Sequence, residues 1–265
     1  MSNEALKFKN SNPHLNFKEM SLMELKKLPV HNGIINFKIT KTSFLMLNVL
    51  NDDSSVVKHF WQGSHDLLCL DLWYDLSLKN GSFIDVGAHT GLYTLTNLRA
   101  NKENDLICFE PHFMNMSRLI TNLRINGLDK KASTILAAAS NFSGKTNFNV
   151  LTDKSYLSKG GRIDKDGEEV NVYALDDIYF EKLKKPLQAI KIDTEGEDYK
   201  VLLGAERLIN EYKPKIIIEV REENKLEINS FFLKYNYQIF NVSNLEQEID
   251  LSNTKIDNIA NFFAK

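Results

Sequence analysis

The sequence predicts an α/β protein built on an open, mostly parallel sheet with helices on both faces. From Ser82 onward, short apolar runs alternate with stretches that carry a helical apolar stripe. Residues 216–220 form an almost continuous apolar run, which is typical of a strand buried on both faces of a parallel sheet. Of the 265 residues, 43% are hydrophobic and 26% are charged. That composition supplies a large core and excludes a disordered chain.

The elements of this core follow from periodicity and from helix-ending residues. Strands are expected at residues 83–86, 106–110, 133–138, 189–193 and 216–220, with a final antiparallel pair at 237–242 and 258–263. Helices are expected at residues 68–76, 113–123, 174–183 and 201–209. Pro111 suits the first position of the second helix, and Gly127 suits its end.

The first 55 residues differ from the rest of the chain. Residues 34–40 and 43–50 are β-prone runs separated by Lys41 and Thr42, which predicts a hairpin. We therefore expect a small N-terminal β/α cap over residues 1–55 and the main domain over residues 56–265.

Composition also excludes several classes of protein. The formal net charge is −2, so the chain lacks the excess of positive charge that a nucleic-acid partner requires. The two cysteines, Cys69 and Cys108, lie in apolar stretches and predict neither a disulfide framework nor a metal cluster. No apolar run approaches the roughly 20 residues of a membrane span, and the N-terminus does not resemble a signal peptide. These features predict a cytoplasmic protein.

The sharpest local signal is a glycine loop at the end of the first core strand. Asp85, Gly87 and Gly91 lie where that strand passes into a helix, and glycines there allow a ligand to approach the backbone closely. Glu110 ends the next strand, where a carboxylate can bind the hydroxyls of a ribose. The spacing is G-x-x-x-G rather than the G-x-G-x-x-G of dinucleotide sites. Negative charge at Asp85 suits an ammonium and a sulfonium, which favours S-adenosylmethionine.

The chain resembles the FkbM-type S-adenosylmethionine-dependent methyltransferases from about residue 60 to residue 263. The resemblance depends on six blocks in the same order, at residues 83–91, 109–111, 122–127, 175–177, 190–196 and 217–219. It implies a Rossmann-like class I methyltransferase fold with a seven-stranded, mostly parallel sheet. It also implies O-methylation, usually of a sugar hydroxyl or a polyketide alcohol.

Carried over by position, the resemblance assigns the methionine end of the donor to Asp85, Gly87 and Gly91 and the ribose to Glu110. Backbone groups of Ala138 or Ala139 are left for the adenine, because the segment around them lacks the usual Asn and Asp. The full set of expected cofactor-binding residues is Asp85, Gly87, Ala88, His89, Gly91, Glu110, Pro111, Ala138, Ala139 and Asp193.

Four carboxylates, those of Asp193, Glu195, Glu197 and Asp198, follow the fourth core strand within six positions. Helix capping accounts for Glu197 and Asp198. Asp193 ends the strand itself and is expected to point into the ligand crevice, where it can accept the proton of an acceptor hydroxyl.

Three other residues are candidates for the chemistry. Glu219 ends the adjacent strand and could share a divalent cation such as Mg²⁺ with Asp193. Lys191 could pair with one of these carboxylates, either for catalysis or only to neutralise the cluster. His65, which with Asp66 begins the helix before the core, is a second candidate for the base.

Three functions remain open at this point. The first is S-adenosylmethionine-dependent methylation of a carbohydrate-type hydroxyl. The second is glycosyl transfer from a sugar nucleotide, with Asp164 and Asp166 as metal-binding acids. The third is a binding module that keeps the fold without turnover. The polar segment 154–169 is either a cover over the acceptor or a plain hairpin. The sequence specifies neither the acceptor nor the oligomeric state.

Overall fold

The computed structural model describes residues 4–63, 65–150, 157, 160–182, 185–257 and 259–265, with only the backbone of 179–182. Its helices are α1 (Glu4–Ser11), α2 (Leu22–Leu25), α3 (Ser54–Gln62), α4 (Leu67–Ser77), α5 (Leu92–Ala100), α6 (Phe113–Ile125), α7 (Leu175–Lys182), α8 (Asp198–Leu203), α9 (Glu206–Tyr212) and α10 (Lys225–Lys234). Two short 3₁₀ helices cover Phe17–Glu19 and Leu251–Asn253. The strands are β1 (Gly33–Lys38), β2 (Ser43–Asn48), β3 (Ser82–Val86), β4 (Asp105–Phe109), β5 (Ala132–Ile135), β6 (Ala138–Ala139), β7 (Gly144–Val150), β8 (Gly161–Ile163), β9 (Glu168–Tyr173), β10 (Leu187–Ile192), β11 (Lys215–Arg221), β12 (Ile239–Asn241), β13 (Asn244–Glu248) and β14 (Ile259–Ala264).

The largest sheet has eight strands in the order β13-β12-β14-β11-β10-β3-β4-β5. Strands β11, β10, β3, β4 and β5 pair in parallel, whereas β14, β12 and β13 are added antiparallel. The predicted mostly parallel α/β sheet is therefore confirmed, but the predicted number of seven strands is wrong. The extra strand is β13, which turns back on β12 and forms an edge.

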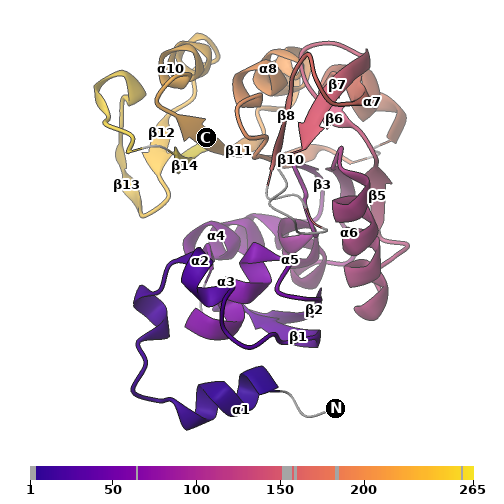
Figure 1. The fold of residues 1–265 in the computed structure, drawn as a ribbon. Coiled ribbons are helices and arrows are strands. Elements are labelled where there is room, and N and C mark those ends of the chain that lie inside the picture. The colour runs from indigo at the N-terminus through magenta and orange to yellow at the C-terminus, as the bar shows by residue number, and fades with distance from the viewer. Residues whose placement is uncertain (1–3, 64, 151–156, 158–159, 183–184, 258) are drawn as a thin grey trace.

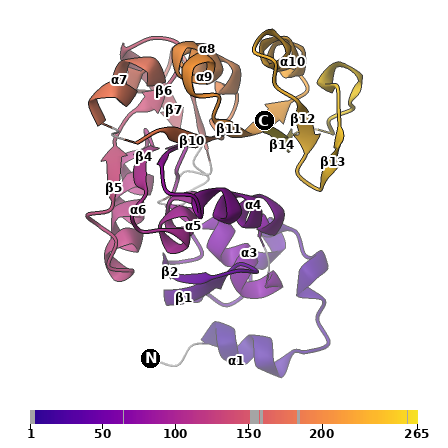
Figure 2. The same cartoon turned by 180° about the vertical axis from the view of Figure 1, so that it is seen from behind.

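Helices cover both faces of this sheet, as predicted (Figures 1 and 2). Strand β11 shows why: Ile216 and Ile218 belong to the core under α8, α9 and α10, and Ile217 belongs to the core under α4, α5 and α6. Side chains of a strand alternate between the two faces, so an apolar run without alternation must be covered on both sides.

The predicted N-terminal hairpin is present as the antiparallel pair β1 and β2. Two asparagines one turn apart, one in the last turn of α6 and one at its C-cap, occupy the open edge of the hairpin. Asn122 Oδ1 accepts the Leu47 N–H at 2.9 Å, and Asn126 Oδ1 accepts the Leu45 N–H at 2.9 Å while its Nδ2 donates to the Leu45 carbonyl at 2.7 Å. These amides replace a neighbouring strand and fasten the hairpin to the main domain.

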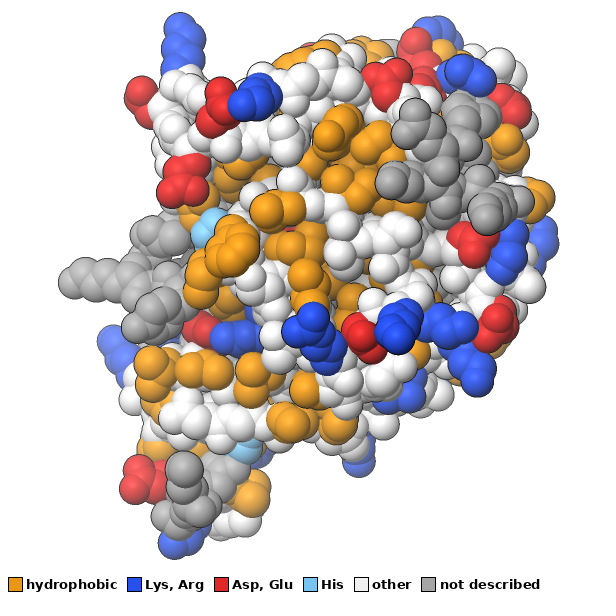
Figure 3. Space-filling view, turned by 90° about the vertical axis from the view of Figure 1, so that its right-hand side faces the viewer, with side chains coloured by type: hydrophobic (Ala, Val, Ile, Leu, Met, Phe, Trp, Pro, Cys, Tyr) orange, Lys and Arg blue, Asp and Glu red, His pale blue; other side chains and the backbone are white. Residues whose placement is uncertain are grey.

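A four-stranded sheet in the order β6-β9-β7-β8 lies beside the ends of β4 and β5. The segment 154–169 therefore contributes β8 and the start of β9 to a sheet, although residues 154–156 and 158–159 lie outside the described part. Figure 3 shows the side of the molecule that faces right in Figure 1, with hydrophobic side chains gathered in its centre.

Three predicted element boundaries are corrected by the structure. Helix α6 begins at Phe113 with His112 as its N-cap, so Pro111 precedes the helix. The predicted strand 133–138 is divided between β5 and β6, which lie in different sheets. The predicted helix 201–209 is divided near Gly204, where a Cβ atom would lie 2.0 Å from the Ser140 carbonyl oxygen. Only glycine permits that approach. The predicted strand 258–263 is β14, whose first predicted residue, Asn258, lies outside the described part.

Candidate active site

A pocket lies at the carboxyl ends of the parallel strands. Among the residues that line it, Gly87 follows β3, Glu110 follows β4, Ala138 lies beyond β5, and Asp193 follows β10. The remaining walls come from the start of α3, the start of α4, α5, and the β7–β8 pair. This is the edge at which open α/β sheets bind ligands.

Gly87 brings two strand ends into direct contact. Its φ is +79°, and a Cβ atom would lie 1.8 Å from the backbone oxygen of Asp193. The N–H groups of Gly87 and Ala88 donate to the Phe109 carbonyl at 3.0 and 2.9 Å, and the Asp193 N–H donates to the Val86 carbonyl at 3.1 Å. His89 continues the loop in the left-handed region, with a φ of +50°. The loop is therefore fixed before any ligand binds.

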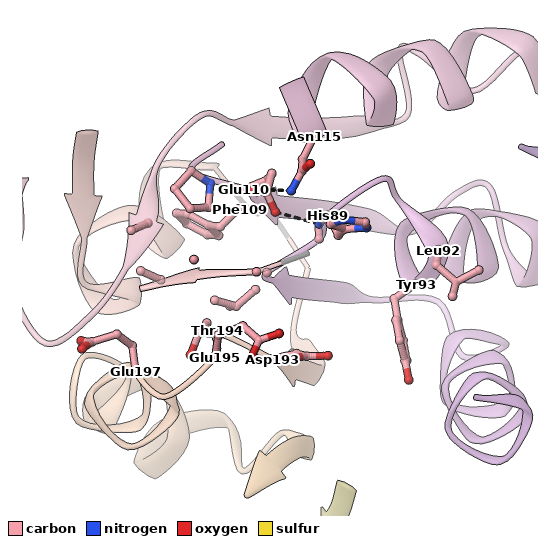
Figure 4. A pocket seen from close by; sticks show the side chains of 18 of the residues that line it. His89, Leu92, Tyr93, Phe109, Glu110, Asn115, Asp193, Thr194, Glu195 and Glu197 are labelled. Carbon is pink, nitrogen blue, oxygen red and sulfur yellow. Dashed lines mark hydrogen bonds between the residues drawn. The ribbon is translucent and has the colours of Figure 1, made fainter. Parts of the chain in front are cut away.

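Glu110 is held by donors from the glycine loop and from the start of α6. Its Oε2 accepts the His89 N–H at 2.9 Å, and its Oε1 accepts the His112 N–H at 2.9 Å and Asn115 Nδ2 at 3.3 Å (Figure 4). Burial raises the pKa of the Glu110 carboxyl above its ordinary value. Each carboxylate oxygen has two lone pairs, so this group can still accept hydrogen bonds from a ligand.

Part of the pocket lining is apolar. It includes Ala137, Ala138 and Ala139 and also Phe148 of β7. Gly161 of β8 packs on this phenylalanine, because a Cβ atom there would lie 2.3 Å from Phe148 Cζ. Alanine side chains and an aromatic ring offer apolar surface on which a flat group can pack.

Asp193 lies in the middle of the pocket, with its side chain 38% exposed. Its Oδ2 accepts a hydrogen bond from Lys191 Nζ at 3.0 Å. Lys191 is 1% exposed and does not itself line the pocket. Burial lowers the pKa of Lys191, but the charges of Asp193 and Asp66 outweigh burial and raise that pKa above its ordinary value. Lys191 therefore remains charged and holds Asp193 in place.

Another part of the pocket lining consists of His65, Asp66 and Tyr93. The Tyr93 hydroxyl donates to Asp66 Oδ2, and the Lys191 ammonium lies 4.8 Å from the centre of the Tyr93 ring. Burial lowers the pKa of His65 below its ordinary value, although Asp66 opposes this. A neutral His65 near pH 7 can accept a proton.

Four of the predicted site residues are not among the residues that line the pocket: Asp85, Gly91, Lys191 and Glu219. Asp85 is 1% exposed and accepts a hydrogen bond from Thr94 Oγ1 at 2.7 Å beneath the loop. Burial raises the pKa of Asp85 to about 6. Gly91, with a φ of +95°, is the N-cap of α5 and packs against Leu119. Direct contact between these two residues and a ligand is therefore not supported.

The acidic side chains after β10 do not all have the predicted capping role. Asp198 accepts the N–H groups of Thr194 and Gly196 at 2.9 and 3.1 Å and so closes the loop before α8. Glu197 makes no side-chain cap; it accepts from Ser140 Oγ at 3.1 Å and lines the pocket, which corrects its predicted role. Glu195 also lines the pocket and pairs with Arg221.

Glu219 lies behind this cluster and accepts a hydrogen bond from Arg221 at 3.3 Å. Burial, followed by the charges of Asp193 and Glu195, raises the pKa of Glu219 from 4.5 to about 8. Between these two values the unfolded chain loses this proton while the folded chain keeps it. The contribution of Glu219 to the free energy of unfolding is therefore largest at acid pH and falls as the pH rises toward 8.

We expect the free energy of unfolding of Glu219→Gln, relative to that of the wild type, to increase as the pH rises from about 5 to about 8. The increase should exceed the ~1.4 kcal/mol that corresponds to one pKa unit. The amide keeps an oxygen for Arg221 and removes the titrating proton. Urea unfolding of both proteins at the two pH values measures this difference. An equal free-energy difference at both pH values would contradict it.

Among the described residues, no three His, Cys, Asp or Glu side chains are grouped so that they could hold a metal ion. Asp164, one of the acids considered for a sugar nucleotide, pairs instead with Arg162 at 3.2 Å and does not line the pocket. Within the described residues, no helix is long and apolar enough to cross a membrane.

Comparison with known proteins identifies the family. The profile of the methyltransferase FkbM domain matches residues 85–239, which is more than half of the chain. The chain belongs to the FkbM methyltransferase family. No curated protein matches its sequence. The family implies S-adenosylmethionine as the methyl donor of this FkbM domain.

Solved structures support the fold of the family. A methyltransferase FkbM from Methylobacillus flagellatus is 16% identical with a TM-score of 0.50, and the match covers 82% of this chain and 54% of that one. This FkbM domain thus spans about half the length of that relative. A SAM-dependent methyltransferase from Agrobacterium tumefaciens is 8% identical with a TM-score of 0.51, covering 90% of this chain and 72% of that one. The fold is therefore methyltransferase-like.

The pocket lining also includes residues that were not predicted as site residues: Ser54, Ser55, Val86, Leu92, Tyr93, Phe109, Asn115, Ala137, Phe148, Gly160, Gly161, Ile163, Thr194, Glu195 and Glu197. Asp66 lines it as well, beside the predicted candidate His65. For Tyr93 a signal existed, because it stands two residues after the second loop glycine, in the first turn of α5. Phe148 gave none, since β7 was not predicted.

Proposed function

We propose that this FkbM domain transfers the methyl group of S-adenosylmethionine to a hydroxyl of a sugar, a glycan or a similar acceptor. The main support is Asp193, a carboxylate fixed by a buried lysine and exposed in the middle of the pocket. A hydroxyl needs a base to become a good nucleophile, and a fixed carboxylate supplies one.

The residues of the pocket fit the methyl donor. The Glu110 carboxylate keeps lone pairs for ribose hydroxyls, the apolar lining that includes Phe148 and Ala138 suits adenine, and Gly87 lets the ends of β3 and β10 meet beside them. When bound, the donor supplies a methyl group on a positively charged sulfur. Asp193 accepts the hydroxyl proton as the oxygen–carbon bond forms and the carbon–sulfur bond breaks. Lys191 holds Asp193 in position, and His65 is the second candidate for the base.

The charge of the pocket favours a neutral acceptor. Among the described residues that line it, none is Lys or Arg, whereas five contribute carboxylates: Asp66, Glu110, Asp193, Glu195 and Glu197. Three of these carboxylates, those of Asp193, Glu195 and Glu197, pair with Lys191, Arg221 and Lys200 behind the lining. Carboxylates accept hydrogen bonds from hydroxyl groups but repel phosphates. This supports a polyhydroxyl acceptor over a nucleic acid.

Calorimetry with S-adenosylmethionine, S-adenosylhomocysteine, NAD and UDP-sugars tests the donor. Preferential binding of NAD or a UDP-sugar would overturn the proposal, and a UDP-sugar would point to glycosyl transfer. Mass spectrometry of glycans from cells with and without the gene tests the acceptor. We expect a mass difference of one CH₂ group; its absence from glycans in cells that make the folded, donor-binding protein would contradict a glycan acceptor and leave a non-catalytic module or a different acceptor.

Glu110→Gln is expected to weaken S-adenosylhomocysteine binding by about 10- to 100-fold, because hydrogen bonds to a charged acceptor contribute roughly 1.5–3 kcal/mol each. The amide keeps the size of the side chain but loses its charge and turns one acceptor into a donor. Calorimetry measures the dissociation constant. Unchanged affinity would remove Glu110 from the donor site.

A further inference from the structure

The order of the pocket residues along the sheet edge gives the donor a direction. From β5 through β4 and β3 to β10, the edge presents Ala138, Glu110, Gly87 and Asp193. With ribose at Glu110 and adenine beside Ala138, the amino-acid end extends past Gly87 toward α4 and α5. Figure 4 shows Tyr93 on this side, away from Glu110.

A carboxylate is needed there to meet the ammonium group, and Asp85 does not supply it. Asp85 is buried under the loop, where it accepts the Thr94 hydroxyl. Asp66 lines the pocket instead. It is the N-cap of α4 with a left-handed φ of +48°, yet its side chain caps no helix N–H. The Asp66 carboxylate is turned to the Tyr93 hydroxyl, which donates to it.

The surroundings hold this pair in place. Trp73 Nε1 donates to the Tyr93 carbonyl at 3.0 Å, and Tyr93 is 9% exposed. Lys191 provides one positive charge, and both Asp193 and Asp66 act on it. Asp193 already pairs with that ammonium at 3.0 Å. The Lys191 ammonium is therefore paired with Asp193, whereas the Asp66 carboxylate accepts from the Tyr93 hydroxyl and can also accept from an ammonium group of a ligand.

We infer that Asp66, oriented by the Tyr93 hydroxyl, binds the ammonium group at the amino-acid end of the methyl donor. The inference rests on the proposed function, because it requires the donor in this pocket. Asp66 contacts the ligand, and Tyr93 is a positioning residue.

The test compares two ligands that differ at this end. S-adenosylhomocysteine carries the amino-acid group, whereas 5′-methylthioadenosine keeps the nucleoside and lacks it. We expect Asp66→Asn to weaken S-adenosylhomocysteine about 10- to 100-fold, the range for a charge-assisted hydrogen bond, with methylthioadenosine unchanged within about twofold. Tyr93→Phe should show the same selectivity with a smaller loss of about 3- to 10-fold. Calorimetry measures all four dissociation constants.

Asp75→Asn is the matched control. Asp75 lies on the same helix, its side chain is 50% exposed, and it pairs with Lys41, so neither affinity should change. Thermal melting of the free variants checks their folding. If Asp66→Asn does not fold, the two ligand affinities of Tyr93→Phe provide the test instead. An unchanged ratio of the two affinities, or an equal loss of both, would overturn the role of Asp66. Failure of the wild type to bind either ligand would overturn the proposed function itself.

Discussion

Gly87→Ala is expected to weaken S-adenosylhomocysteine binding by about 100-fold or more and to lower the melting temperature. The added Cβ would lie 1.8 Å from the Asp193 backbone oxygen, so the ends of β3 and β10 must separate. A displacement of about 1 Å in an active site costs on the order of 10²-fold in rate. We expect a loss of similar size in affinity, because the same loop would hold the donor. Both changes arise because the strand ends on which Gly87 lies also carry the base and the glycine loop.

Gly63→Ala is the control that separates the effect of this clash from the effect of backbone strain. Gly63 has a φ of +76°, close to that of Gly87, but no atom lies within 4 Å of its Cβ position. It ends α3 outside the pocket lining. We expect only the roughly 1 kcal/mol that a non-glycine residue costs in the left-handed region, with ligand affinity kept. Similar losses for both variants in calorimetry and thermal melting would show that strain, rather than contact with Asp193, dominates at Gly87.

Asp193→Asn is expected to slow methyl transfer about 10²–10⁴-fold, the usual contribution of a general base, while S-adenosylhomocysteine affinity changes little. The amide keeps the shape of the side chain but cannot take the hydroxyl proton. The measurement is single-turnover formation of S-adenosylhomocysteine with the acceptor that the mass spectrometry identifies.

Two results would contradict this role for Asp193. Turnover at the wild-type rate would assign the proton to another group, with His65 as the next candidate. A loss of donor affinity without a loss of turnover at saturating donor would make Asp193 a binding residue only. Asp75→Asn on the exposed side of α4 again serves as the matched substitution.

Local sequence signals predicted most of the elements and nine of the 25 described residues that line the pocket. Gly87, Glu110 and Asp193 each follow an apolar run, and the carboxyl ends of parallel strands meet at one edge of a sheet. That Gly87, Glu110 and Asp193 lie together at this edge could therefore be predicted without coordinates. Boundaries were less accurate, because whether Gly204 interrupts a helix depends on the backbone of Ser140, which lies far away in the sequence.

The amino-acid sequence by itself determined the alternation of strands and helices, the family and the strand-end residues, because these depend on periodicity and spacing along the chain. Only the tertiary structure decided which acid reaches the pocket. Asp85 and Asp66 both precede the glycine loop in sequence, but Asp85 is turned into the buried interior, whereas the start of α4 brings Asp66 to Tyr93 of α5. Side-chain direction and the packing of separate helices set that outcome, and neither is written in local sequence.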